Sequence, residues 1–119
     1  MLQILVVEDE QSISNLIKIN LTRAGYACDC AYDGLAAVDM LDKKPYDLVL
    51  LDITMPGRSG LEVLEEMLGL VPNVRVIMCS AVGQEMMIQK ALTIGASDFI
   101  VKPFKADEFS RIVNRCLEQ

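Results

Sequence analysis

Short runs of apolar residues recur five times along the chain, and each has the length of a β-strand. The third and fourth runs contain nearly continuous apolar stretches, VLL and VRVIM, rather than alternating ones. Continuous stretches are typical of strands that are buried on both faces, as in a parallel sheet. The predicted strands span residues 3–7, 27–31, 48–51, 74–79 and 98–101.

Between these strands, apolar residues recur every three or four positions, which is the period of an amphipathic helix. The helical apolar positions fall within residues 13–24, 35–41, 61–68, 87–92 and 109–117. Gly25 and Gly95 follow the first and fourth of these segments as stop signals. Strand and helix therefore alternate five times, so we predict an α/β fold with a doubly wound parallel sheet, in one domain over residues 1–119.

The charge balance argues against several classes of partner. The chain has 17 acidic residues, 11 lysines and arginines and no histidine, which gives a net charge of −6. Nucleic-acid binding depends largely on cations, so we expect no direct contact with nucleic acid or with an anionic membrane. No apolar run approaches the ~20 residues of a membrane span, and the start, MLQILVVEDE, lacks the basic segment of a signal peptide. We therefore expect a cytoplasmic protein.

The four cysteines are predicted to be free thiols, as in a reducing compartment. Cys28 and Cys30 alternate along one strand, so they share a face but lie too far apart to form a disulfide. Cys79 and Cys116 fall at apolar positions, which favours burial over metal binding.

Polar side chains stand where four of the predicted strands end. Glu8 and Asp9 follow the first strand, Asp52 the third, Ser80 the fourth and Lys102 the fifth. In an open parallel sheet, ligands bind beyond these carboxyl ends. We expect the three carboxylates to meet if the first and third strands are neighbours.

Three crowded carboxylates repel one another unless a cation compensates them. Mg²⁺ suits such a site because it takes oxygen ligands, often one or two carboxylates together with phosphate oxygens. A carboxylate nucleophile, a lysine and a hydroxyl are also groups that phosphoryl transfer requires. The sequence thus predicts a magnesium-dependent phosphorylation site.

The chain resembles the receiver domains of two-component response regulators over its whole length. The resemblance rests on ILVVEDE, DLVLLDITMPGRSGLE, VIMCSA and GASDFIVKPF at the family's spacing. It implies a flavodoxin-like sheet of strand order 2-1-3-4-5 and a response regulator that is a phosphoacceptor rather than an enzyme. The implied phosphodonor is a sensor histidine kinase or a phosphotransfer protein.

The resemblance also implies a role for each site residue. Asp52 accepts the phosphoryl group; Glu8, Asp9, Asp52 and the backbone carbonyl of Thr54 hold Mg²⁺. Lys102 contacts the phosphoryl group, and the peptide bond before Pro103 is cis. Thr54 and Val82 stand at positions that tune hydrolysis, and neither is a strong water-orienting group, so we expect no very fast self-dephosphorylation.

The implied switch pairs Ser80, whose hydroxyl moves toward the phosphoryl group, with Phe99, which swings inward behind it. The expected output surface comprises the fourth helix, fifth strand and fifth helix, with Met86 facing outward as an adaptable contact for a downstream protein. Both a monomer and a phosphorylation-dependent dimer fit this scheme.

Three alternatives remain open from the sequence. A haloacid-dehalogenase phosphatase also uses an aspartate nucleophile, but it needs a second aspartate where Thr54 stands. A flavodoxin-like FMN carrier needs a phosphate-binding loop where the acidic Glu8 and Asp9 stand. Within the receiver interpretation, the chain is expected to be either a stand-alone regulator, for example of the chemotaxis type, or the receiver part of a larger DNA-binding or enzymatic regulator.

Overall fold

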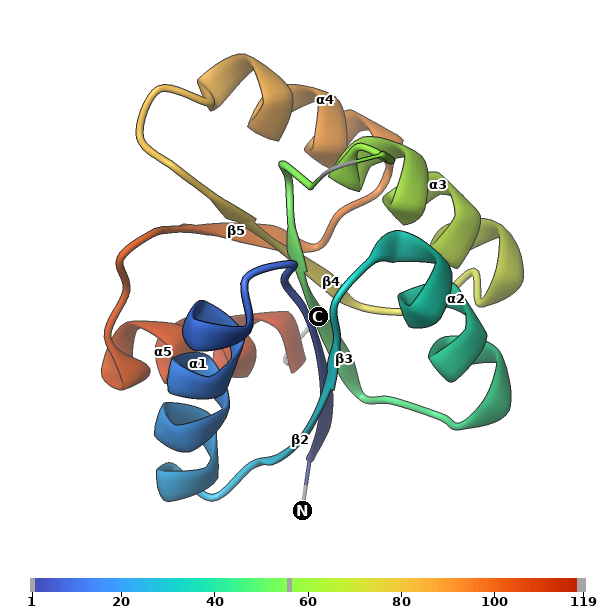
Figure 1. Cartoon of the computed structure of the whole chain (residues 1–119). Coiled ribbons are helices and arrows are strands. Elements are labelled where there is room, and N and C mark those ends of the chain that lie inside the picture. Colours follow the sequence, from blue (N-terminus) through green and yellow to red (C-terminus); the bar gives the residue numbers. More distant parts are fainter. Residues whose placement is uncertain (1, 56, 118–119) are drawn as a thin grey trace.

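The computed structural model describes residues 2–55 and 57–117, and in them strand and helix alternate five times (Figure 1). The strands are β1 (Gln3–Val7), β2 (Ala27–Ala31), β3 (Leu48–Asp52), β4 (Val76–Ser80) and β5 (Asp98–Val101). The helices are α1 (Gln11–Arg23), α2 (Gly34–Lys43), α3 (Gly60–Leu70), α4 (Glu85–Ile94) and α5 (Ala106–Leu117).

All five strands pair in parallel, in the order β2-β1-β3-β4-β5. The predicted α/β fold and its strand order are therefore confirmed. The first and third strands are neighbours, with Val7 opposite Leu51. This register brings the residues that follow β1 next to the end of β3, as the predicted site requires.

The sheet separates two apolar cores. On one face, α1 and α5 pack over a cluster that includes Ile17, Leu21 and Phe109. On the other, α2, α3 and α4 cover a larger cluster that includes Leu51, Val63 and Met67 (Figure 1). Every residue of β3 and β4 is buried, which explains why their sequences read as nearly continuous apolar runs.

The cysteines lie where the sequence placed them. Cys79 and Cys116 are buried, while Cys28 and Cys30 are half-buried against the same core, and all four are free thiols. Burial raises the pKa of Cys28 to about 11 and that of Cys79 to about 12, so both stay protonated and unreactive near neutral pH.

Some boundaries and faces differ from the predictions. The fourth strand begins at Val76 rather than residue 74, because the turn out of α3 runs from Val71 to Val74, and it extends through Ser80. Leu16 and Leu35 belong to apolar helical patterns, yet they are 59% and 72% exposed. Each stands beside its helix's buried stripe, which runs through Ile17 and Leu21 in α1 and through Ala37 and Leu41 in α2.

Among the described residues, no helix combines the length and apolarity that crossing a bilayer requires.

The loop from β3 into α3 is held close to the end of β3. The Gly60 N–H donates to the carbonyl oxygen of Ile53 at 2.7 Å. A Cβ at Gly60 would collide with the carbonyl oxygen of Asp52 and would lie 2.7 Å from the Ile53 Cα. Glycine is therefore required here for the loop to pass so near Asp52. The Ser59 side chain then caps α3 by accepting from the Glu62 N–H.

We predict that Gly60→Ala destabilises the domain by about 1–3 kcal/mol, since the new methyl group meets backbone that cannot yield. Gly69→Ala is the matched control, because this position of α3 has open space around a Cβ, and alanine in a helix interior is favoured by about 1 kcal/mol over glycine. Urea unfolding of the two variants checks the prediction, and equal midpoints for Gly60→Ala and the parent chain would contradict it.

Candidate functional site

Three carboxylates meet at the carboxyl ends of β1 and β3. Glu8 and Asp52 are buried, at 3% and 5% exposure, and Asp9 is half-buried beside them. Each offers an oxygen, and these oxygens lie within 4.8 Å of one another. The predicted meeting of the carboxylates is thus what the structure shows.

Lys102 supplies a positive charge to this cluster from across the sheet. It follows β5, at the edge of the sheet, and its side chain passes the end of β4 to reach the acids. Its Nζ lies 3.2 Å from Glu8 Oε1, to which it donates a hydrogen bond, and 3.3 Å from Asp52 Oδ1. The side chain is 26% exposed, so solvent screens these ion pairs only in part.

The acids and the lysine shift one another's proton affinities. Burial, followed by the hydrogen bond and charge of Asp52, raises the pKa of Glu8. Burial and the neighbouring Glu8 raise the pKa of Asp9. Burial acts to lower the pKa of Lys102, but the charges of Asp52 and Glu8 outweigh it and raise that pKa. Lys102 therefore stays protonated, and the cluster still holds more carboxylates than cations.

This arrangement fits a hard divalent cation. Three oxygen donors converge, and the single ammonium group of Lys102 does not balance their charge. Carboxylates are the ligands that Mg²⁺ prefers in proteins. A cavity of about 480 Å³ opens over the cluster, which leaves room for water and a phosphoryl group. Its lining comprises Glu8, Asp9, Glu10, Asp52, Thr54, Met55, Ala81, Gln84 and Lys102.

Ser80 ends β4 beneath this cavity. It is fully buried, and its hydroxyl has no hydrogen-bond partner. The Lys102 N–H donates to the Ser80 carbonyl oxygen at 2.7 Å, which fixes the backbone but leaves the side chain unsatisfied. A buried hydroxyl without a partner is costly, so it favours any rearrangement that brings an acceptor within reach.

Gln84 contributes to the cavity, although the sequence analysis did not identify it. Its Oε1 accepts from the Ala81 N–H at 2.7 Å, and its Nε2 donates to Thr54 Oγ1 at 2.7 Å. It stands at the N-cap of α4 but makes no capping hydrogen bond there. The available signal was a glutamine at a helix start, where serine, threonine, aspartate or asparagine is the usual cap.

Comparison with known proteins identifies the family. The family model described as response regulator receiver domain matches residues 4–114. The chain belongs to this family. It is 44% identical over 108 residues to the chemotaxis protein CheY of Listeria monocytogenes, covering 90% of this chain and 91% of that one. It is 36% identical to CheY of Thermotoga maritima over 95% of both chains.

Solved structures of receiver domains share the fold. The receiver domain of NtrX from Brucella abortus has a TM-score of 0.92 and 36% identity over 98% of both chains. The longer NtrX chain has a TM-score of 0.93, and the present chain spans only 27% of it. A receiver domain from Clostridium thermocellum has a TM-score of 0.94 at 27% identity, covering 99% of this chain and 95% of that one.

The receiver domain brings most of the predicted site residues together. Glu8, Asp9, Asp52, Thr54 and Lys102 line one cavity, and the Thr54 N–H donates to Asp52 Oδ1 at 3.3 Å. Ser80 is fully buried and does not line this cavity, whereas the next residue, Ala81, does. The Lys102–Pro103 peptide bond is cis, as expected.

Phe99 lies apart from the cavity. The residue is 37% exposed on the edge strand β5. It lies on the side of the sheet that α4 covers, where it lines a groove together with Ala81, Val82 and Ile88. In this structure the aromatic ring therefore faces outward.

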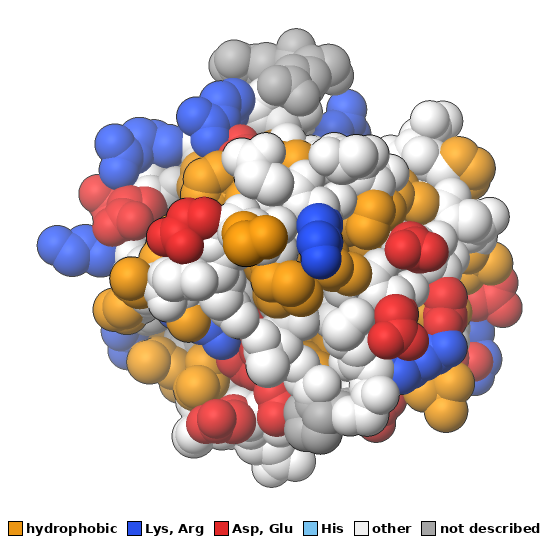
Figure 2. Space-filling model, turned by 90° about the horizontal axis from the view of Figure 1, so that it is seen from above, with side chains coloured by type: hydrophobic (Ala, Val, Ile, Leu, Met, Phe, Trp, Pro, Cys, Tyr) orange, Lys and Arg blue, Asp and Glu red, His pale blue; other side chains and the backbone are white. Residues whose placement is uncertain are grey.

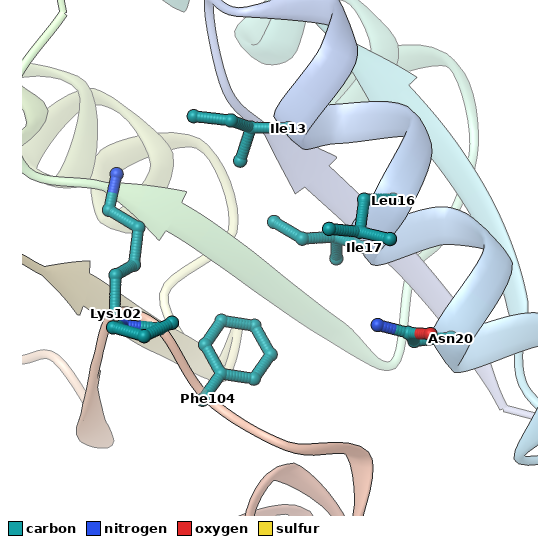
Figure 3. Close-up of a pocket in the computed structure, with 7 residues that line it drawn as sticks. Ile13, Leu16, Ile17, Asn20, Lys102 and Phe104 are labelled. Carbon is teal, nitrogen blue, oxygen red and sulfur yellow. The ribbon is translucent and has the colours of Figure 1, made fainter.

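A groove beside α1, on the face of the sheet that α1 and α5 cover, adjoins the acidic cavity at Lys102. Figure 3 shows Ile13, Leu16 and Ile17 of α1 facing Phe104, with Asn20 at one end. These residues line an apolar groove of about 340 Å³. Lys102 and Pro103 complete its lining, so the groove begins at the residue that pairs with Asp52. The exposed Leu16 is part of this groove.

We predict that Mg²⁺ stabilises this receiver domain through the acidic cluster. Excess Mg²⁺ should raise its melting temperature, because a cation that binds only the folded state adds about 2.7 kcal/mol at a hundred times its Kd. Asp9→Asn should abolish most of that rise while sparing the Lys102 ion pairs. Asp42→Asn, which removes an exposed carboxylate of α2, is the control. A Mg²⁺-dependent rise that is the same in Asp9→Asn and Asp42→Asn argues against this cation site.

Proposed function

We propose that Asp52 is the phosphoacceptor of this receiver domain and takes its phosphoryl group from a phosphohistidine. An Asp52 carboxylate oxygen attacks phosphorus, forming a P–O bond while the P–N bond breaks. The imidazole leaves with the bonding electrons and takes up a proton, and the product is an aspartyl phosphate. The observation that carries this proposal is that Lys102 reaches both Asp52 and Glu8 at the lining of an open cavity.

The surrounding residues fit distinct parts of that reaction. Lys102 lies 3.3 Å from the attacking carboxylate, so its charge is placed to stabilise phosphoryl oxygens. Glu8, Asp9, Asp52 and the Thr54 carbonyl would hold Mg²⁺, which would supply charge neutralisation for the phosphoryl oxygens. Ser80 offers a hydroxyl whose hydrogen-bonding capacity is unused.

We further propose that phosphorylation changes the surface made by α4, β5 and α5. The buried Ser80 hydroxyl gains an acceptor when phosphoryl oxygens form nearby, and its movement draws the loop after β4 toward Asp52. Phe99 borders the groove beside that loop, so it can turn inward as the loop leaves.

The downstream partner of this surface is a protein with an apolar contact patch. Met86 is 77% exposed on α4, and Leu92 is partly exposed on the same helix. Figure 2 shows the molecule from above, where α4 and α3 lie uppermost in Figure 1, and hydrophobic side chains gather around one basic side chain in the middle of this face, with charged side chains of both signs at its margin. Such a rimmed apolar area is typical of a protein-binding surface.

The similar proteins include both a chain of about this length and a much longer chain that contains a receiver domain. The chain covers 95% of the Thermotoga maritima CheY chain but about a quarter of the NtrX chain. We propose that residues 1–119 form one receiver domain in either arrangement, and that its output passes through contact with a protein surface.

Incubation with acetyl phosphate and Mg²⁺ should add one phosphoryl mass to the parent chain and none to Asp52→Asn, which retains shape but lacks the nucleophile. Intact-mass spectrometry checks this, with Asp47→Asn as a control at the amino end of β3. Undiminished labelling of Asp52→Asn would overturn the assignment.

After removal of the donor, we expect the phosphoryl group to persist beyond a few seconds, as neither Thr54 nor Val82 orients water strongly.

We propose that the phosphodonor protein docks in the apolar groove of α1, because a protein seated there stands beside Lys102 and Asp52. Leu16→Asp should slow transfer from an autophosphorylated sensor kinase by about tenfold or more and leave labelling by acetyl phosphate unchanged. Leu35→Asp, at an exposed leucine on α2 across the sheet, is the matched control. Equal slowing by both substitutions, or slowing with acetyl phosphate as well, would refute a docking role for this groove.

A further inference from the structure

The side chain of Gln84 joins two loops across the mouth of the site cavity. Thr54 belongs to the loop after β3, and Ala81 directly follows β4. The Ala81 N–H can only donate, so the amide oxygen of Gln84 must face it. The amide nitrogen then faces Thr54 and donates to its hydroxyl oxygen. Both hydrogen bonds are 2.7 Å long, so one amide group satisfies both loops at once.

This bridge occupies a backbone donor at the reaction cavity. Ala81 lines the same cavity as Asp52, and its N–H is already occupied by Gln84. Phosphoryl oxygens on Asp52 are strong acceptors that require nearby donors. The Ala81 N–H becomes available to them only after the Gln84 amide has moved away.

The bridge also holds the adjoining residue away from a partner. Ser80 immediately precedes Ala81, is fully buried and has an unsatisfied hydroxyl. A shift of the Ser80 backbone toward the cavity would carry the Ala81 N–H along and so break its hydrogen bond to Gln84. Gly83 lies between Ala81 and Gln84 with a φ of +94°, a conformation open to glycine, so the loop has a residue at which it can bend.

We propose that the Gln84 side chain is a latch that holds the loop after β4 in its unphosphorylated position and is displaced when a phosphoryl group forms on Asp52. The latch rests on the proposed phosphorylation of Asp52. Gln84 is a positioning residue, because it acts through Ala81 and Thr54 rather than on phosphorus. Its side chain makes no capping bond to α4, so its removal leaves that helix's own hydrogen bonds intact.

Two substitutions separate hydrogen bonding from bulk. Gln84→Ala removes the whole amide, and Gln84→Met keeps the length of the side chain but neither hydrogen bond. Both should speed labelling by acetyl phosphate about three- to tenfold, the factor that one net hydrogen bond represents. Asn73→Ala, which removes an exposed amide at the other end of β4, is the control and should leave the rate unchanged.

A second readout does not depend on phosphorylation. In the unphosphorylated protein, hydrogen exchange of the Ala81 amide should become about tenfold faster in both Gln84 variants, while amides of β4 keep their protection. Unchanged Ala81 exchange and unchanged labelling would overturn the latch, as would slower labelling of either variant. Faster labelling by Gln84→Ala alone would assign the effect to bulk and would also overturn it.

Failure of the latch and failure of the proposed function give different results. If Gln84 variants match the parent chain while Asp52→Asn blocks labelling, only the latch fails. If Asp52→Asn is labelled like the parent chain, the proposed function itself fails.

Discussion

The ion pairs of Lys102 with Glu8 and Asp52 are the constraint on which the site depends. Two carboxylates that are almost fully buried cannot both remain charged without a cation beside them. The parallel register of β1 and β3 forces these acids together, and the lysine reaches them from the end of β5. One side chain therefore couples three strands. Because it compensates only part of the negative charge, it leaves a site that attracts a further cation.

The carboxyl ends of the strands also leave the Ser80 hydroxyl, at the end of β4, without a hydrogen-bond partner. Val101 is opposite Ser80, and the Lys102 N–H donates to the Ser80 carbonyl, so the Ser80 backbone is tied to the segment that carries the lysine. The Ser80 side chain gains nothing from that bond and remains unsatisfied. The Ala81 N–H is satisfied by Gln84 instead of by a group on Asp52. The backbone of the loop after β4 is therefore held in place by these hydrogen bonds. The Ser80 hydroxyl remains free to donate to an acceptor that forms near Asp52.

The strand–helix alternation was enough to predict a parallel sheet with polar residues at its carboxyl ends. The strand order that brings Glu8, Asp9 and Asp52 together was implied by the family resemblance, because periodicity alone does not say which strands are neighbours. Loop paths obey no such periodicity. The Gln84 contacts depend on how two loops fold back toward each other, which spacing alone does not encode. The exposure of Leu16 likewise depends on where the segment at Phe104 passes, and that path leaves a groove rather than a packed interface.

The short segment from Phe99 to Phe104 connects the three surfaces that signalling requires. Phe99 borders the groove beside α4, Lys102 reaches the acids, and Phe104 lines the groove beside α1. Phe99 lies on the face that α4 covers and Phe104 on the face that α1 covers, and Lys102 stands between them just beyond the end of β5. A charge placed on Asp52 acts first on Lys102, whose backbone is bonded to Ser80. The proposed donor groove on α1 and the α4 part of the proposed output surface lie on opposite faces of the sheet, and the segment from Phe99 to Phe104 borders both.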